Sequence, residues 1–208
     1  MHIVDGALSN EVVIAGGVLA VGGIALGLRK LDMEKIPVAG VLSATFFVAS
    51  LISVPVPPTS VHLIMNGLAG IILGWAAFPA LFVGLLLQSV FFGFGGLTVL
   101  GINTVNIALP AVVAFYLCRS GILTAAPKKA AIWGGIAGAL AIALTTGVVA
   151  ISLTLSGEKF YEAAKLVFLA HIPVMIIEGF VSAAAVYLIR KVKPELFDLH
   201  NTVSQGAD

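Results

Sequence analysis

The first six residues, Met1-His2-Ile3-Val4-Asp5-Gly6, carry the groups in this chain best suited to bind a metal ion. Because His2 is bulky, Met1 is expected to be kept, which leaves a free α-amine beside an imidazole. The Met1 amine, the deprotonated backbone nitrogen of His2 and Nδ1 of its ring can occupy three corners of a square. Square-planar nitrogen sites favour nickel(II) or copper(II). The alternative is a chance histidine that binds nothing.

A square needs a fourth ligand, and His62 is the best candidate elsewhere in the chain. A histidine at position three would let the N-terminus fill all four corners, whereas one at position two leaves a corner open. Thr59 and Ser60 are good N-cap residues, so a helix is predicted from about Val61 to Ala77 with His62 in its first turn. For His62 we favour the role of ligand over a structural role.

The composition is that of an integral membrane protein. The chain has 208 residues, 60% of them hydrophobic and only 10% charged, and its mean hydropathy is +1.12. This apolar content is enough for an all-α bundle of about seven transmembrane helices of roughly 20 residues each. The net charge of +1 does not indicate nucleic-acid binding. Cys118 is the single cysteine, so neither an internal disulfide nor a cysteine-based zinc site is expected.

Seven apolar stretches are predicted to cross the membrane, at about 12–28, 36–54, 61–77, 79–92, 103–117, 130–155 and 171–188. An amphipathic piece that includes Glu162 and Lys165 precedes the last one. Residues 1–192 are expected to form a single membrane domain, followed by a short polar cytoplasmic tail at 193–208.

Basic residues set the expected orientation. With seven spans and the N-terminus outside, nine of the eleven lysines and arginines face the cytoplasm, and only Lys159 and Lys165 face out. Because basic residues are retained on the cytoplasmic side, we expect the N-terminus outside and the C-terminus inside. The Met1-His2 chelator would then lie on the external side.

Several polar residues interrupt the apolar spans and are expected to converge on the outer half of the bundle. Ionisable groups inside a membrane are functional candidates by default. The cavity candidates are Asn66, Gln88, Asn103, Asn106, His171 and Glu178. Only Glu178 is expected to reach the middle of the bundle.

Each of these residues also has a structural interpretation. Asn66 and Gln88 can simply hydrogen-bond neighbouring helices. His171 can satisfy backbone that Pro173 frees, and Glu178 can pair with His171 or with a backbone group. His200 lies in the polar tail and is expected to be solvated.

Four sequence blocks resemble the CbiM/NikM family, the cobalt- and nickel-binding S-components of energy-coupling factor transporters. They are the N-terminal hexapeptide, Pro57-Pro58-Thr59-Ser60-Val61-His62, the stretch from Gln88 to Asn106 with Gly93-Phe94-Gly95-Gly96, and His171-Ile172-Pro173 with Glu178-Gly179. They occur in the family's order and span most of the chain.

The resemblance implies a metal site and its ligands. In the family the N-terminus folds back into the bundle, and the metal is held by the amine matching Met1, the backbone and ring nitrogens matching His2, and the histidine matching His62. Asp5 would anchor the inserted segment, and cavity residues, Ser60 included, would orient the ligands. Residues 1–192 would be a substrate-binding domain in the cell inner membrane that carries no permanent cofactor, with Ni²⁺ or Co²⁺ as the transported ion.

The resemblance also implies partners. The family's S-component works with a transmembrane coupling subunit, two ATPase subunits and often a small two-helix membrane protein. In agreement, the chain contains no Gly-x-x-x-x-Gly-Lys-Ser/Thr phosphate loop, so it is not expected to be an enzyme itself. The segment Lys193–Asp208 is too short and polar to be a fused two-helix partner, which is therefore expected to be a separate chain.

Two other classes of function fit the sequence less well. A stand-alone secondary transporter would show inverted repeats, whereas this chain has an odd span count and no visible repeat. An intramembrane metalloprotease would need a spacing such as His-Glu-x-x-His, which is absent. If histidine nitrogens bind the ion, protons should compete, and affinity is expected to fall below about pH 6.

Overall fold

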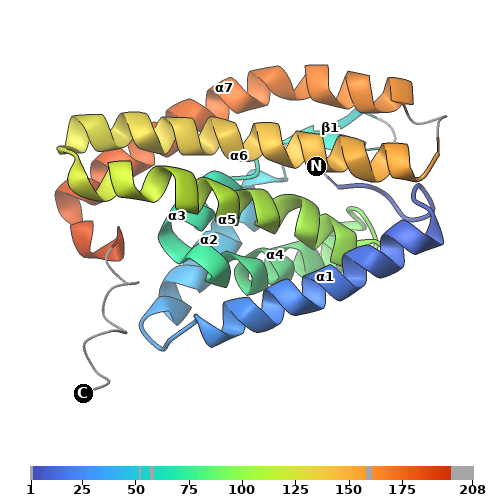
Figure 1. The fold of residues 1–208 in the computed structure, drawn as a ribbon, viewed down its shortest axis with the longest axis horizontal. Helices are drawn as coiled ribbons and strands as arrows, with labels where there is room; N and C mark the ends of the chain where they lie inside the picture. The colour runs from blue at the N-terminus through green and yellow to red at the C-terminus, as the bar shows by residue number, and fades with distance from the viewer. Residues whose placement is uncertain (1, 52, 57–58, 158–160, 198–208) are drawn as a thin grey trace.

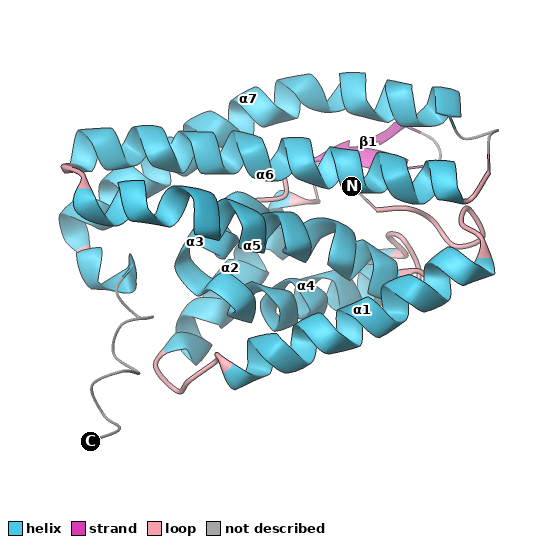
Figure 2. Ribbon diagram, viewed as in Figure 1, coloured by secondary structure: helices cyan, strands magenta, loops and turns pink. Residues whose placement is uncertain are grey.

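The computed structural model describes residues 2–51, 53–56, 59–157 and 161–197. Met1 and His200, which figured in the predictions, lie outside these residues. The described chain is a bundle of helices with one short hairpin (Figures 1 and 2). Its helices are α1 (Asn10–Arg29), α2 (Lys35–Ala49), α3 (Asn66–Leu73), η1 (Gly74–Ala76), α4 (Ala77–Phe92), α5 (Leu100–Thr124), α6 (Pro127–Leu155), α7 (Tyr161–Val192) and η3 (Pro194–Phe197).

Helix α5 lies at the centre of the bundle, where it packs against α1, α3, α4 and α6. The long helices α6 and α7 run side by side over much of their length (Figure 1). Glycines permit this close approach: a Cβ added at Gly138 would lie 2.7 Å from the carbonyl oxygen of Glu178. Small residues are the usual means by which membrane helices pack tightly.

The third predicted helix begins later than expected, and this prediction was wrong for its first turn. Residues Thr59–His62 form strand β2, which pairs antiparallel with β1 (Ser53–Val56) so that His62 lies opposite Ser53. Prolines and β-branched residues dominate 53–61, and both disfavour helix in favour of extended backbone. His62 therefore ends a strand instead of starting a helix. The all-α prediction is otherwise confirmed.

Helix α3 is short and completely buried. Its eight residues are about 12 Å long, too short to cross a bilayer. Gly74, with φ 56° and ψ −126°, ends α3 and redirects the chain into η1 and α4. A Cβ at Gly67 would lie 2.7 Å from the Cα of Gly138, so α3 approaches α6 at backbone contact distance.

The last predicted span and the amphipathic piece before it are one helix, which corrects the predicted start at His171. Helix α7 is continuous from Tyr161 to Val192 although Pro173 lies inside it. In the charged first turn, Lys165 and Glu162, three residues apart, form an exposed ion pair at 3.1 Å, a spacing that favours helix. His171 consequently lies ten residues inside α7, on a buried face.

Five helical stretches in the described residues are long and apolar enough to cross a membrane, and α2 is a shorter apolar helix. One of the five, Asn66–Phe92, contains the break at Gly74. The structure thus has a multi-pass membrane composition, while seven complete crossings and an outside N-terminus remain predictions. The expected tail begins with η3, whose Phe197 side chain is buried.

Candidate metal centre

His2 and His62 meet inside the bundle, 60 residues apart in the sequence. The N-terminal segment runs back into the bundle (Figure 1). Nδ1 of His2 lies 3.2 Å from Nε2 of His62. The two rings stack with centroids 4.7 Å apart, and the ring of Phe94 lies 5.9 Å from that of His2. Both imidazoles are almost completely buried, with 2% and 3% of their surface exposed.

A chain of hydrogen bonds determines which nitrogen of His2 carries the proton. Ser50 Oγ donates to the carbonyl of Phe47 at 2.8 Å, and Gln88 Nε2 donates to Ser50 Oγ at 2.5 Å. This orientation leaves Gln88 Oε1 as an acceptor for Nε2 of His2, at 2.5 Å. Because a neutral imidazole has one N–H, placing it on Nε2 leaves Nδ1 with a lone pair.

Hydrogen bonding also determines which ring nitrogen of His62 carries the proton. Its Nδ1 lies 2.8 Å from the carbonyl oxygen of Leu63, which can only accept, so Nδ1 carries the proton and Nε2 has the lone pair. The two nitrogens that face each other are therefore both electron-pair donors. A metal-binding histidine typically commits its second nitrogen to an oxygen acceptor in this way.

Burial keeps both rings neutral. It lowers the pKa of His2 to about 4, against the opposing effect of the hydrogen bond to Gln88. It lowers the pKa of His62 to about 4 as well, against the hydrogen bond to Leu63. Protons therefore compete for these two rings only well below the pH of about 6 that free histidine suggests.

Asn103 on α5 anchors the N-terminal segment. Its side-chain oxygen accepts the N–H of Ile3 at 3.1 Å, and its Nδ2 donates to the carbonyl of Ile3 at 3.0 Å. One buried amide thus satisfies both backbone groups of the residue next to His2. Such a two-point bond substitutes for the sheet or helix partners that this segment lacks.

Asp5 forms a second anchor, with the loop between α4 and α5. Its backbone N–H donates to the carbonyl of Gly95 at 2.9 Å, and its carboxylate accepts Thr98 Oγ1 at 2.5 Å. Gly95 and Gly96 have φ angles of +77° and +132°, which side-chain-bearing residues rarely adopt. A Cβ at Gly96 would also overlap the Asp5 carboxylate. Asp5 thus joins the N-terminal segment to this loop.

Glu178 on α7 holds the chain just after His62. Its Oε1 accepts the backbone N–H groups of Ile64 and, at 2.7 Å, of Met65. Met65 has the left-handed φ of 57°, which turns the chain from the hairpin into α3. Glu178 therefore positions the turn that carries His62, a backbone contact that the sequence analysis left open as one alternative.

The remaining polar candidates form bonds deeper between the helices. Asn66 Nδ2 donates to the carbonyl of Ile107 and to Thr145 Oγ1, both at 2.9 Å. Asn106 accepts from Ser152 Oγ at 3.2 Å. These contacts support the structural interpretation of Asn66, and no described hydrogen bond joins either asparagine to the two histidines.

His171 also has a structural contact. Its Nδ1 lies 2.6 Å from the carbonyl of Val167, one turn earlier in α7. The proline at 173 deprives the carbonyl of Leu169 of its usual helical donor, so His171 does not cap the group that the proline frees. Its Nε2 has no hydrogen bond among the described residues.

Sequence reasoning missed Ser50, which completes the chain that orients His2. A lone serine at the end of an apolar helix was the only signal for it. The side chain of Ser60 lies outside the described structure. Within the described residues, no three His, Cys, Asp or Glu side chains are grouped to hold a metal.

Comparison with known proteins extends over almost the whole chain. The family model for the "cobalt uptake substrate-specific transmembrane region", CbiM, matches residues 2–196. A "putative metal transport protein" of Haemophilus influenzae is 44% identical over 200 residues, which cover 95% of this chain and 97% of that protein. A "cobalt transport protein CbiM" of Sorangium cellulosum is 30% identical, with 95% of each chain covered.

A nickel-related relative and a solved structure complete the comparison. The "fused nickel transport protein NikMN" of Rhodobacter capsulatus is 31% identical over 79% of this chain, which spans only 50% of that protein. A crystal structure of a transition metal transporter has the same fold, with a TM-score of 0.77, 24% identity and complete coverage of both chains. The match over residues 2–196, which contains both facing histidines and their anchors, shows that this chain belongs to the CbiM family.

Proposed function

We propose that this chain is the substrate-binding component of an energy-coupling factor transporter that imports Ni²⁺ or Co²⁺. The proposed ligands are the Met1 amine, the backbone nitrogen and Nδ1 of His2, and Nε2 of His62. The observation that carries the proposal is the pair of lone-pair nitrogens facing each other at 3.2 Å, each with its second ring nitrogen committed to an oxygen acceptor.

The spacing of the two rings suits neighbouring corners of a square. Metal–nitrogen bonds of about 2.0 Å at right angles separate the two nitrogens by about 2.8 Å. The distance of 3.2 Å requires only a small closure. In this geometry the amine and amide of the N-terminus fill the other two corners, and the enclosed position favours release of the ion's water.

The ion would enter from the side on which the N-terminal segment lies. Binding would draw His2 and His62 together and order the segment that Asn103 and Asp5 anchor. We propose that a coupling subunit and two ATPase subunits, with a separate two-helix membrane protein, drive release on the other side. The relative named as a fused nickel transport protein supports an additional module, since this chain spans half of it.

The experiment compares the native protein with a variant that carries two extra glycines before Met1. One glycine would place the histidine at position three, where the N-terminus fills all four corners by itself, whereas two glycines move it to position four. Both proteins are purified and titrated with Ni²⁺ and Co²⁺ while visible absorption is recorded. We expect a square-planar nickel band in the native protein and its loss in the extended one, because the extension displaces the amine from the chelate. The ratio of the two affinities identifies the preferred ion.

The His200→Ala variant is the matched control, because it removes a histidine without touching the proposed ligands. It should bind both ions as the native protein does. Equal binding by the glycine-extended protein would remove the N-terminus from the site. Uptake of Ni²⁺ by the isolated chain in ATP-free liposomes would instead favour a stand-alone secondary transporter.

A further inference from the structure

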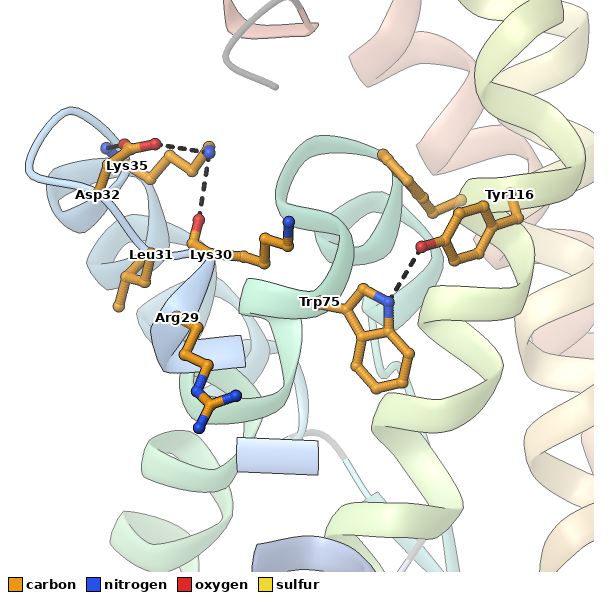
Figure 3. A pocket seen from close by; sticks show the side chains of 8 residues that line it. Arg29, Lys30, Leu31, Asp32, Lys35, Trp75 and Tyr116 are labelled. Atoms are coloured by element: carbon orange, nitrogen blue, oxygen red, sulfur yellow. Dashed lines mark hydrogen bonds and ion pairs between the residues drawn. The ribbon is translucent and has the colours of Figure 1, made fainter. Parts of the chain in front are cut away.

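A basic and aromatic pocket lies at the end of α1, at the turn into α2. Its volume is about 350 Å³, and its lining includes Arg29, Lys30, Trp75 and Tyr116. In Figure 3, the Lys30 side chain extends from the turn toward Trp75, and Arg29 leaves the same turn in another direction. Neither residue takes part in the metal site.

The charges of this pocket are not balanced. Lys35 is buried and its ammonium binds Asp32 at 2.7 Å and the carbonyl of Lys30 at 3.2 Å, so these two opposite charges offset each other (Figure 3). Arg29 and Lys30 are exposed, and neither forms an ion pair with any residue that the structure describes. The pocket therefore presents two positive charges in excess.

The aromatic groups of this pocket are of the kind that gathers at a membrane surface. Trp75 Nε1 donates a hydrogen bond to the hydroxyl of Tyr116 at 3.0 Å, and the Tyr116 side chain is 64% exposed. Tryptophan and tyrosine gather where lipid headgroups meet the hydrocarbon region. The basic turn is also on the side that the charge distribution predicts to be cytoplasmic.

An apolar groove continues from the pocket along α1 and α5. It has a volume of about 300 Å³, is lined by Val18, Gly22, Leu26 and Leu109 among others, and shares Trp75 with the basic pocket. From Val18 to Arg29, α1 rises about 16 Å, which is comparable to an extended acyl chain. The two cavities together are polar and cationic at one end and apolar along the rest.

We propose that this double cavity binds one anionic phospholipid. The headgroup phosphate would contact Arg29 and Lys30, and an acyl chain would lie in the groove beside Trp75. Basic pockets between membrane helices on the cytoplasmic side commonly take anionic headgroups. A soluble phosphate would use the charges but leave the groove empty, and a zwitterionic lipid would gain nothing from two excess positive charges.

Trp75 supplies a direct measurement. The chain has two tryptophans, so a Trp133→Phe background leaves Trp75 as the only one. This protein is reconstituted in vesicles of brominated phosphatidylglycerol or brominated phosphatidylcholine, whose bromine atoms quench tryptophan fluorescence on contact. We expect quenching that shows a preference for the anionic lipid of about fivefold per contacting basic residue. The Arg29→Gln/Lys30→Gln variant should lose this preference.

The matched control is Lys128→Gln/Lys129→Gln, which removes two exposed lysines from the first turn of α6. It should keep the preference, because these lysines do not line the pocket. An equal loss in both double variants would mean general surface attraction and would overturn the proposal. Nickel binding, measured in parallel, reports whether each variant is folded.

Two further results would also overturn it. If inorganic phosphate abolishes the preference while sodium chloride of equal ionic strength does not, the pocket takes a soluble phosphate. If the native chain shows no preference but the Arg29→Gln/Lys30→Gln variant no longer co-purifies with a coupling subunit, the pocket is a protein-docking surface.

Discussion

The two facing histidines are held in different ways. His2 lies on a segment without regular structure, held by side chains of α4, α5 and the loop between them, whereas His62 ends a strand whose exit is held by one carboxylate of α7. The N-terminal segment belongs to no helix or strand, so breaking its side-chain bonds would not require any helix of the bundle to unfold. The chain that follows His62, by contrast, is bonded directly to helix α7 through Glu178. We infer that His2 belongs to the movable half of the site and His62 to its fixed half.

The largest difference should appear when the histidines themselves are removed. His2→Ala removes the ring that closes the N-terminal chelate, so nickel binding should be lost, by more than about 1,000-fold. His62→Ala leaves three nitrogens at the N-terminus, so affinity should fall by about 100-fold, at least as much as the loss of a group that only orients a ligand. Calorimetric titration with Ni²⁺ measures both. Equal losses would show that the two residues contribute alike.

The pH dependence of stability tests whether both rings are buried and neutral. Between the free-histidine pKa of 6.5 and the folded value of about 4, the unfolded chain binds a proton at each ring and the folded chain does not. The free energy of unfolding should therefore fall as the pH falls through this window, by about 3 kcal/mol per histidine.

Thermal unfolding of the metal-free protein in detergent at pH 7 and pH 4.5 measures this effect. The His62→Gln variant should lose part of the dependence, because one titrating ring is gone. A native protein whose stability does not change between these two pH values would contradict the buried, neutral pair.

Glu178 tests the fixed half. Glu178→Leu leaves the N–H groups of Ile64 and Met65 without their acceptor, so the turn after His62 should shift and metal affinity should fall 10- to 100-fold. Glu178→Gln keeps a side-chain oxygen for both donors and should bind nearly as well as the native protein. If Glu178→Gln binds the metal as the native protein does but no longer supports uptake, the negative charge of Glu178 lies on the route of the ion.

Asn103 tests the movable half and should have a smaller effect. Asn103→Ala removes two bonds to Ile3, which should cost about 1.4 kcal/mol of ordering and lower affinity about tenfold. Thr98→Val, the milder control, removes one exposed bond to Asp5 and should change affinity by less than threefold.

A double-mutant cycle of Asn103→Ala and Glu178→Leu then tests the independence of the two halves. If the anchors act separately, the two losses of binding free energy should add within about 0.5 kcal/mol. A larger coupling would mean that the N-terminal segment and the hairpin move as one unit.

Residue types in the sequence pointed to the histidines and amides that the fold brings together here, but not to the local backbone structure that carries them. The chemistry of His2 and the special position of His62 could be deduced from residue types, and Asn103 and Gln88 were identified because amides are rare in apolar helices. The hairpin was missed because its prolines and β-branched residues were interpreted as a loop and helix cap. The continuous α7 was missed because its charged first turn and Pro173 appeared to mark boundaries.

The sequence by itself determined a membrane bundle, its family and the nitrogen atoms available to a metal. Only the tertiary structure decided which of those nitrogens carry protons. The tautomer of His2 depends on Gln88 and Ser50, which packing brings from 86 and 48 positions away. A ring nitrogen becomes a ligand when the other nitrogen finds an acceptor, and that acceptor is supplied by the fold.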